Sequence, residues 1–242
     1  MLSRFYSENP VLSDHAELSG SEAHHLQHVL RADIGTEIVI WDGSGREFDA
    51  RVLKMDRSTV FCEIVSVREV CRELPVMVTL GVALPKGERQ RWLVEKTVEL
   101  GVSRIVPLIA ERSVAQPTQS ALGRMRRTVI EASKQCRRNR AAEISTARQV
   151  EDFLECCPDE ALRCIAHPES SKPNRSLFDH IHTLNRPTKH VCLAIGPEGG
   201  FSDQEIEWSD RYGWHRVDLG PRTLRVETAA VALLAAVGLS TV

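Results

Sequence analysis

The pattern of hydrophobic and polar positions divides the chain into two parts. In the first, β-branched and aromatic residues form short runs typical of strands, at 36–41 (TEIVIW), 46–54 (REFDARVLK) and 59–67 (TVFCEIVSV). Asp42-Gly43-Ser44-Gly45 separates the first two runs and is a strong turn signal. Residues 21–31 (SEAHHLQHVLR) predict a helix with Ser21 as its N-cap. This part therefore predicts a small β-rich domain over residues 1–73.

From Val76 onward, apolar runs alternate with helical segments. Strands are predicted at 76–84, 104–109, 162–166, 190–195 and 215–219. Helices are predicted between them, near 88–100, 121–138, 148–156, 202–212 and 226–240. This alternation favours an α/β domain with a mostly parallel sheet over residues 74–242.

A glycine-rich loop, Gly196-Pro197-Glu198-Gly199-Gly200, follows the apolar run VCLAI. Ser202 and Glu205 then have the spacing of a capping box, so a helix should begin at once. Ligands of open parallel sheets bind beyond the carboxyl ends of strands. Three glycines favour close approach of a ligand over a simple tight turn, although the loop has neither the dinucleotide nor the phosphate-loop motif.

A second loop, 219–225 (LGPRTLR), repeats the arrangement after the run HRVDL. Glu227 and Thr228 fall in the first turn of the helix that follows, where an acidic side chain suits the helix dipole. The rest of that helix is apolar on nearly every face. It must be buried, either in the core or against a partner subunit.

Composition limits the classes of protein that fit. With 42% hydrophobic and 26% charged residues, the 242-residue chain is typical of a soluble globular protein. No apolar run has the length of a membrane span, and MLSRFYSENP lacks the apolar centre of a signal peptide. Seven cysteines without a CxxC pair indicate reduced thiols and a cytoplasmic protein, with neither disulfides nor zinc.

Charge is distributed unevenly along the chain. Residues 1–74 hold 8 Lys and Arg against 13 Asp and Glu, a balance of −5, whereas the remaining residues have a balance of +3. Within the second part, 124–140 (RMRRTVIEASKQCRRNR) carries seven basic residues and one acid. Such a cluster can attract phosphate, and the alternative is a solvated helix face.

The loops GPEGGFS and LGPRTLRVETA together resemble those of the SPOUT superfamily of S-adenosylmethionine-dependent RNA methyltransferases. More narrowly, the chain is similar to the bacterial 16S ribosomal RNA uracil-N3 methyltransferase family. HHLQHVLRADIG and WDGSGREFDA resemble that family's PUA-like RNA-binding domain, and 84–101 and 131–138 resemble further motifs. Thr223 departs from the pattern, since a bulky aliphatic residue is usual there.

The resemblance implies a small PUA-like β-barrel followed by an α/β domain with a C-terminal trefoil knot. It also implies methylation of a uridine in ribosomal RNA or the small ribosomal subunit by a homodimer; independently, the residue spacing predicts no metal. S-adenosylmethionine would be the cofactor, held by Ala166, His167, Ile195, Gly196, Pro197, Glu198, Gly199, Gly200, Leu219, Gly220, Arg222, Thr223, Leu224, Arg225 and Thr228.

Methylation at uracil N3 requires loss of the N3 proton and stabilisation of the charge that spreads to O2 and O4. Candidate cations are Lys86, Arg112, Arg138, Arg222 and Arg225, and candidate bases are Glu198, Glu227 or water. We expect catalysis to depend on Arg138, Arg225 and Glu198. For Glu227, pairing with Arg222 or Arg225 at the helix start is favoured over a role as a base.

Contacts with RNA are expected from Arg4, His25, Arg31, Lys86, Arg112, Arg124, Arg127, Arg137 and Arg138. For Arg137 and Arg138, phosphate is the favoured partner, because most nucleic-acid contacts are to the backbone. His24, His25 and His28 have helical spacing but no matching carboxylate or cysteine, so packing or RNA contact is favoured over metal binding.

Two other functions fit the same residues. A SPOUT enzyme acting on another RNA position would share both loops. A non-catalytic RNA-binding factor in ribosome assembly would keep the fold but bind no cofactor, which the intact loops argue against.

Overall fold

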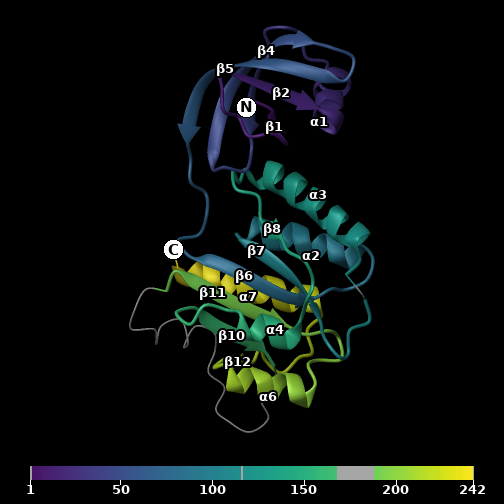
Figure 1. The fold of residues 1–242 in the computed structure, drawn as a ribbon, viewed down its shortest axis with the longest axis vertical. Coiled ribbons are helices and arrows are strands. Elements are labelled where there is room, and N and C mark those ends of the chain that lie inside the picture. The colour runs from purple at the N-terminus through teal and green to yellow at the C-terminus, as the bar shows by residue number, and fades with distance from the viewer. Residues whose placement is uncertain (1, 116, 168–187, 242) are drawn as a thin grey trace. The chain divides into compact units, whose positions relative to one another are not determined.

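A computed structural model describes residues 2–115, 117–167 and 188–241 (Figure 1). The chain forms two compact units, Met1–Glu73 with Ser133–Ala141 and Leu74–Ala132 with Ala142–Val242. The first unit thus includes a short segment, Ser133–Ala141, from the middle of the second part of the chain.

A curled five-stranded sheet, in the order β1-β3-β4-β5-β2, forms the body of the first unit. Its strands are β1 (Arg4–Tyr6), β2 (His15–Ser19), β3 (Glu37–Trp41), β4 (Arg46–Met55) and β5 (Thr59–Glu69). β1 runs parallel to β3, and the other pairs are antiparallel. Buried side chains alternate with exposed ones along β2 and much of β4, so one face of the sheet supplies the core.

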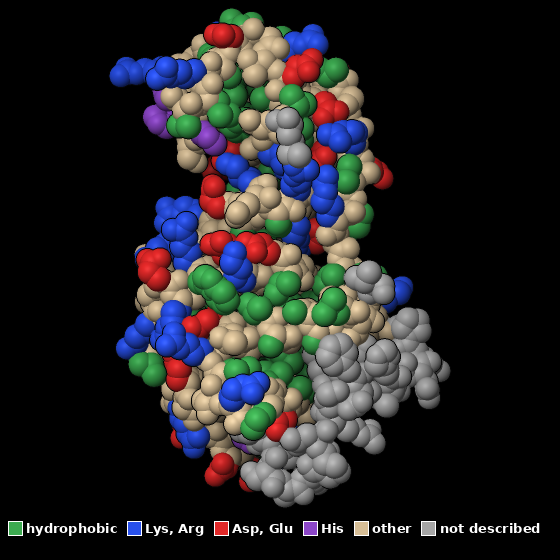
Figure 2. Space-filling model, turned by 180° about the vertical axis from the view of Figure 1, so that it is seen from behind, with side chains coloured by type: hydrophobic (Ala, Val, Ile, Leu, Met, Phe, Trp, Pro, Cys, Tyr) green, Lys and Arg blue, Asp and Glu red, His purple; other side chains and the backbone are tan. Residues whose placement is uncertain are grey.

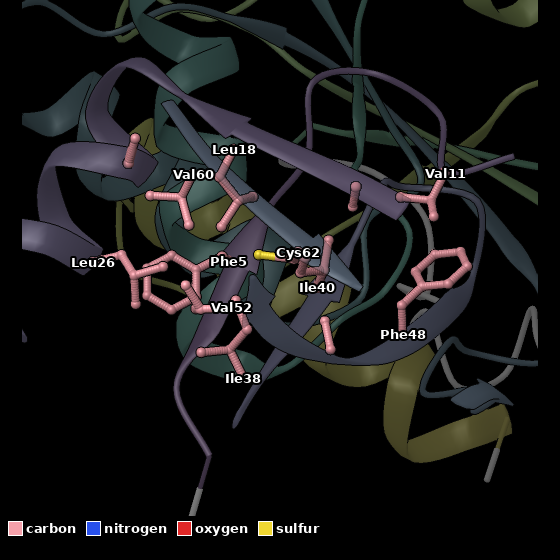
Figure 3. Packing of buried hydrophobic residues seen from close by; sticks show 13 residues of the cluster. Phe5, Val11, Leu18, Leu26, Ile38, Ile40, Phe48, Val52, Val60 and Cys62 are labelled. Atoms are coloured by element: carbon pink, nitrogen blue, oxygen red, sulfur yellow. The ribbon is translucent and has the colours of Figure 1, made fainter. Parts of the chain in front are cut away.

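The core of this unit is a single apolar cluster (Figure 3). Phe5, Leu26 and Ile40 are fully buried in it, and Cys62 belongs to the same cluster as a small hydrophobe. Burial raises the pKa of the Cys62 thiol to about 12, so this cysteine stays protonated at neutral pH.

The predicted helix of this unit differs in detail from the structure. α1 (Gly20–His24) begins one residue before Ser21 and continues as a π-helix, η1 (His25–Val29). Ser21 is therefore not the N-cap: Ser19 occupies that position, and its side chain makes no capping hydrogen bond. The predicted Asp42–Gly45 turn is confirmed, with the Asp42 carboxylate accepting hydrogen bonds from the backbone of Val11 and Ser44.

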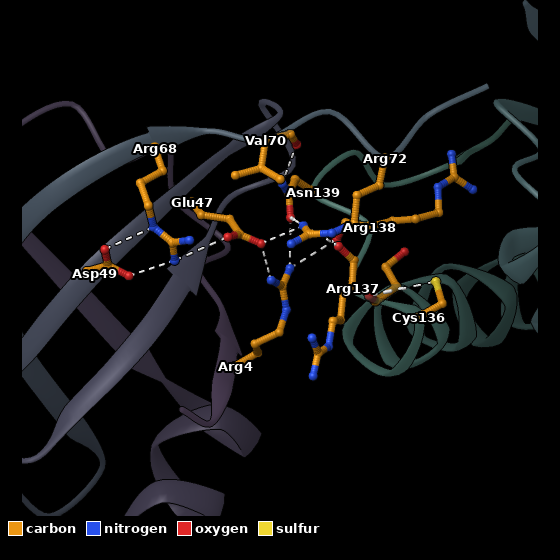
Figure 4. Close-up of polar contacts among 11 residues, drawn as sticks. Arg4, Glu47, Asp49, Arg68, Val70, Arg72, Cys136, Arg137, Arg138 and Asn139 are labelled. Carbon is orange, nitrogen blue, oxygen red and sulfur yellow. Dashed lines mark hydrogen bonds and ion pairs between the residues drawn. The ribbon is translucent and has the colours of Figure 1, made fainter. Parts of the chain in front are cut away.

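A buried polar network joins β4 to the segment Ser133–Ala141 (Figure 4). The Glu47 carboxylate, 2% exposed, accepts hydrogen bonds from Arg4 and Arg72. Both guanidinium groups also donate to the Asn139 side-chain oxygen, at 2.9 and 3.3 Å. The Asn139 amide in turn donates to the carbonyl of Val70 at 2.7 Å. A buried carboxylate with several cationic donors satisfies the requirement that buried charges be paired.

The second unit contains a parallel sheet in the order β12-β10-β11-β6-β7-β8, with β9 also paired to β7, within the described residues. Every strand pair that the structure describes in this sheet is parallel, as the sequence predicts. The strands are β6 (Met77–Ala83), β7 (Arg104–Ile109), β8 (Glu143–Ile144), β9 (Arg148–Gln149), β10 (Leu162–Ala166), β11 (His190–Ile195) and β12 (His215–Val217).

Helices of this unit include α2 (Glu88–Glu99), α4 (Val150–Glu155), α6 (Asp203–Arg211) and α7 (Val226–Thr241), together with most of α3 (Gln119–Cys136). α7 packs along α2 and against β6 and β11 (Figure 1). Its buried residues include Leu233, Leu234 and Val237, whereas Leu239 is exposed. The helix is thus largely a core element, as its composition requires. The trefoil knot stays a prediction.

Replacing Glu47 with Gln should destabilise the first unit by about 3 kcal/mol, because the half-buried Arg4 and the more exposed Arg72 lose a counter-charge that accepts hydrogen bonds from both. Burial raises the pKa of Glu47, but hydrogen bonds from Arg4 and Arg72 outweigh it, so the pKa lies below its usual value. The resulting stability is present above the unfolded-state pKa of about 4.3 and is lost as pH falls through the folded-state value. Thermal unfolding from pH 7 to pH 3 measures both effects.

The exposed Glu63 on β5 provides the control, Glu63→Gln. An unchanged unfolding midpoint for Glu47→Gln at pH 7 would show that the network contributes nothing to stability.

Candidate functional site

Three parallel strands end side by side at one edge of the second unit's sheet. Ala166, the last residue of β10, lies in register with Ile195 of β11 and with Val217 of β12. The backbone amide of His167 donates to the carbonyl of Val217 at 3.1 Å, which extends this pairing by one residue. The loops that follow β11 and β12 must therefore begin at the same edge.

A cavity of about 450 Å³ lies between these segments. Its walls contain the residues predicted to bind the cofactor except Arg225 and Thr228, which are exposed but do not line it. The sequence prediction omitted six further lining residues, Phe201, Val217, Asp218, Pro221, Val226 and Ala229. Most of these are apolar neighbours of the two loops, so the walls are more hydrophobic than the loop motifs indicate.

Packing or backbone conformation accounts for each glycine of the 196–200 loop. A Cβ at Gly196 would stand 3.0 Å from the Phe201 ring, and one at Gly199 would stand 3.3 Å from the Cβ of Arg112. Gly200 has φ +73°, which favours glycine. Packing and backbone conformation thus account for all three glycines, so their presence alone does not distinguish a ligand site from a tight turn.

The loop after β7 braces the 196–200 loop. The Arg112 guanidinium donates to the carbonyls of Gly199 and Phe201 at 3.1 and 3.2 Å. The buried Glu205 carboxylate accepts from the backbone amides of Ser202 at 2.8 Å and Glu111 at 2.9 Å. The predicted capping box is confirmed, and it also joins the start of α6 to the loop after β7.

Arg89 is a site residue that the sequence analysis missed. Its guanidinium lies 3.0 Å from Glu198, in the cavity wall, and 3.9 Å from the buried Glu227. The expected pairing of Glu227 with Arg222 or Arg225 was wrong, because the ionic partner comes from α2. No local pattern signals this contact, since residue 89 is more than a hundred positions from both carboxylates.

Two predicted arginines belong to the first unit, where Arg138 is buried and Arg4 is half-buried. Arg138 is 3% exposed and donates to Glu73, while Arg4 is held by Glu47 and Asn139. The structure therefore does not place Arg138 among the residues that line the cavity.

The other residues predicted to contact RNA differ in their exposure to solvent. The Lys86, Arg31, Arg124 and Arg127 side chains are exposed, and Arg137 is half-buried with φ +64°. The centroids of the His25 and Phe5 rings lie 5.9 Å apart.

Within the described ranges, no group of three or more His, Cys, Asp or Glu side chains is arranged to hold a metal. None of the described helices combines the length and apolar character needed to cross a bilayer.

Replacing Arg112 with Ala should weaken binding of S-adenosylhomocysteine about fivefold, because two loop carbonyls lose their charged donor. Calorimetry measures the affinity, with the exposed Arg148→Ala as control. Unchanged cofactor affinity together with weaker RNA binding would favour the RNA contact predicted from the sequence over a bracing role.

Comparison with known proteins gives consistent matches. A family model described as an RNA methyltransferase domain matches residues 72–238, and one described as an RNA methyltransferase PUA domain matches residues 18–65. A Bacillus subtilis protein named ribosomal RNA small subunit methyltransferase E is 30% identical over 93% of this chain and 90% of its own. Its namesake from Synechocystis is 34% identical over 90% of this chain and 71% of its own.

Solved structures give the same result. A Legionella pneumophila protein, solved in complex with the bound cofactor SAM, has a TM-score of 0.87 and 33% identity over 98% of this chain and 97% of its own. A ribosomal RNA small subunit methyltransferase E from Neisseria gonorrhoeae, bound to S-adenosylmethionine, has a TM-score of 0.85 and 30% identity over 98% of this chain and 96% of its own. The chain therefore belongs to the ribosomal RNA small subunit methyltransferase E family.

Proposed function

We propose that this protein transfers a methyl group from S-adenosylmethionine to N3 of one uridine in small-subunit ribosomal RNA. The observation that carries the proposal is the cavity at the carboxyl ends of β10, β11 and β12, in a chain whose relatives are small-subunit methyltransferases. Two related structures hold S-adenosylmethionine, which supports the choice of cofactor. The choice of N3 rests on the resemblance of the GPEGGFS and LGPRTLRVETA segments.

The cavity has properties that suit a nucleoside cofactor. Its volume of about 450 Å³ falls within the range of about 300–1,000 Å³ usual for small-molecule sites. Gly200 and Gly220, both in its walls, have positive φ and open space where a Cβ would stand. Backbone groups of both loops can therefore approach a ligand closely, while Ile195, Leu219 and Leu224 provide apolar walls.

The cofactor supplies an activated methyl group, so the chain must orient the uracil and stabilise its deprotonated form. Arg222 lines the cavity, and Arg225 follows three residues later in the same loop. Within the described residues, neither guanidinium makes an ion pair or a side-chain hydrogen bond. Both remain available to a developing negative charge, so this loop is our choice for the cation.

Glu198 is the candidate proton acceptor that lines the cavity, whereas Glu227 is buried and lies outside its lining. The geometry thus favours Glu198 over Glu227, and water remains the alternative acceptor. For Arg138, its burial and its bonds to Glu73 support a structural role in the first unit.

RNA binding is assigned to both predicted domains, 1–73 and 74–242. The exposed arginines of α3, Arg124 and Arg127, are suited to phosphate contacts, which the salt dependence of RNA binding measures. The first domain would contribute through exposed residues such as Arg31. Because the substrate is ribosomal RNA, we place the enzyme in the cytoplasm.

A homodimer is part of this proposal. Hydrophobic side chains gather on the surface in the lower part of Figure 2. Separately, the large apolar side chains Trp92 of α2 and Leu239 of α7 are 43% and 77% exposed. Exposed apolar surface of this kind favours a protein–protein contact. Sedimentation of a monomer at micromolar concentration would contradict it.

The function predicts one specific modification. Small-subunit RNA from a strain lacking the gene should lose a single N3-methyluridine, and the purified protein with S-adenosylmethionine should restore it. Mass spectrometry of nuclease fragments locates the base. A methyl group at another position would favour the alternative SPOUT activity, and absence of both methylation and cofactor binding would favour a non-catalytic assembly factor.

Replacing Arg225 with Ala should slow single-turnover methylation about tenfold at neutral pH, equivalent to about 1.4 kcal/mol. Loss of the cation raises the pKa of the bound imide, so the rate-against-pH profile should move to higher pH. Arg211→Ala, on the exposed surface of α6, is the control. A superimposable profile would exclude Arg225 from stabilising the anion.

A further inference from the structure

Three charged side chains from separate segments meet beside the cavity. Arg89 lies in the first turn of α2, Glu198 in the loop after β11, and Glu227 in the first turn of α7. One terminal nitrogen of Arg89 lies 3.0 Å from a Glu198 oxygen, and the other lies 3.9 Å from a Glu227 oxygen. The guanidinium therefore lies between two carboxylates instead of forming a closed pair with one.

Glu227 needs a cation because of its burial. Its side chain is 8% exposed, and one of its carboxylate oxygens has no hydrogen bond within the described part of the chain. A buried carboxylate is costly unless it is paired. Among the described residues, Arg89 is its ion-pair partner, so the position of Arg89 is constrained from the α7 side.

Helix packing fixes the backbone that carries Arg89. Leu93, Val94 and Val98 of α2 are fully buried, and α2 packs along α7. By contrast, Glu198 lies in a loop, and its side chain is 39% exposed. The rigid partner in the Arg89–Glu198 pair is thus the helix, and the adjustable partner is the wall of the cavity.

We propose that Arg89 is a positioning residue that holds the 196–200 loop in register with the first turn of α7, and so sets the shape of the cofactor cavity. The inference rests on the proposed function, because it takes this cavity as the cofactor site. Arg112 fixes the main chain of the same loop through two carbonyls, whereas Arg89 fixes its one charged side chain. The two arginines thus act on different groups of one loop.

A purely structural role would have a different consequence. If Arg89 did no more than neutralise Glu227, removing both charges together would restore everything that loss of Arg89 costs. If Arg89 also positions Glu198, that double change would restore stability but leave cofactor affinity low. The two roles are therefore separable by measuring stability and affinity on the same variants.

The experiment compares the full-length protein with Arg89→Met, Glu198→Gln, both together, and Arg89→Met with Glu227→Gln. Arg91→Met, an exposed arginine of the same helix, is the matched control. Calorimetry with S-adenosylhomocysteine gives affinity, and thermal unfolding gives stability. Wild-type protein that fails to bind S-adenosylhomocysteine would overturn the proposed function, and with it this inference.

With wild-type binding established, Arg89→Met and Glu198→Gln should each weaken the affinity for S-adenosylhomocysteine about threefold to tenfold. The double variant should bind no more weakly than whichever single variant binds more weakly. Arg89→Met with Glu227→Gln should recover the unfolding midpoint but not the affinity. Additive losses in the Arg89–Glu198 cycle, wild-type affinity in Arg89→Met, or full recovery of affinity when Glu227→Gln is added would each overturn the proposal.

Discussion

The register of three parallel strands is the constraint on which the site depends. Because Ala166 pairs with both Ile195 and Val217, the segments after β10, β11 and β12 leave the sheet at one edge. Parallel strands present their carboxyl ends together, and the resulting crevice is where open α/β sheets bind ligands. The cavity is thus a consequence of topology, and the loops determine its walls.

The cavity walls are held in place by contacts from neighbouring segments of the second unit. Arg112 binds loop carbonyls, Glu205 joins the capped start of α6 to the loop after β7, and Arg89 reaches from α2. The exposed ion pair of Arg89 with Glu198 is weak by itself, but together with the Arg112 and buried Glu205 hydrogen bonds it opposes movement of a loop in which three of five residues are glycine. A site braced in this way binds its ligand with less cost in ordering.

Much of this architecture could be predicted from the sequence, because local signals and tertiary structure agree. The parallel α/β domain, the Ser202–Glu205 capping box and the Asp42–Gly45 turn follow from period and spacing. β1 and β2 were missed. β1 is only three residues long, which is too short for a pattern to show. β2 (His15–Ser19) does alternate buried and exposed positions, so its pattern was present in the sequence and overlooked. Arg89 and the burial of Arg138 could not be predicted, since each depends on partners that only the fold brings near. The glycines alone could not decide whether the loop binds a ligand, because packing, backbone conformation and close approach of a ligand all select the same residue.

Hydrogen–deuterium exchange with and without S-adenosylhomocysteine tests most directly whether the two loops close on one ligand. Slower exchange should appear in peptides covering 195–201 and 217–229, while the strands of the first unit, 37–69, should exchange as before. Protection confined to one loop, or absent from both, would contradict a cofactor site formed by the ends of β11 and β12.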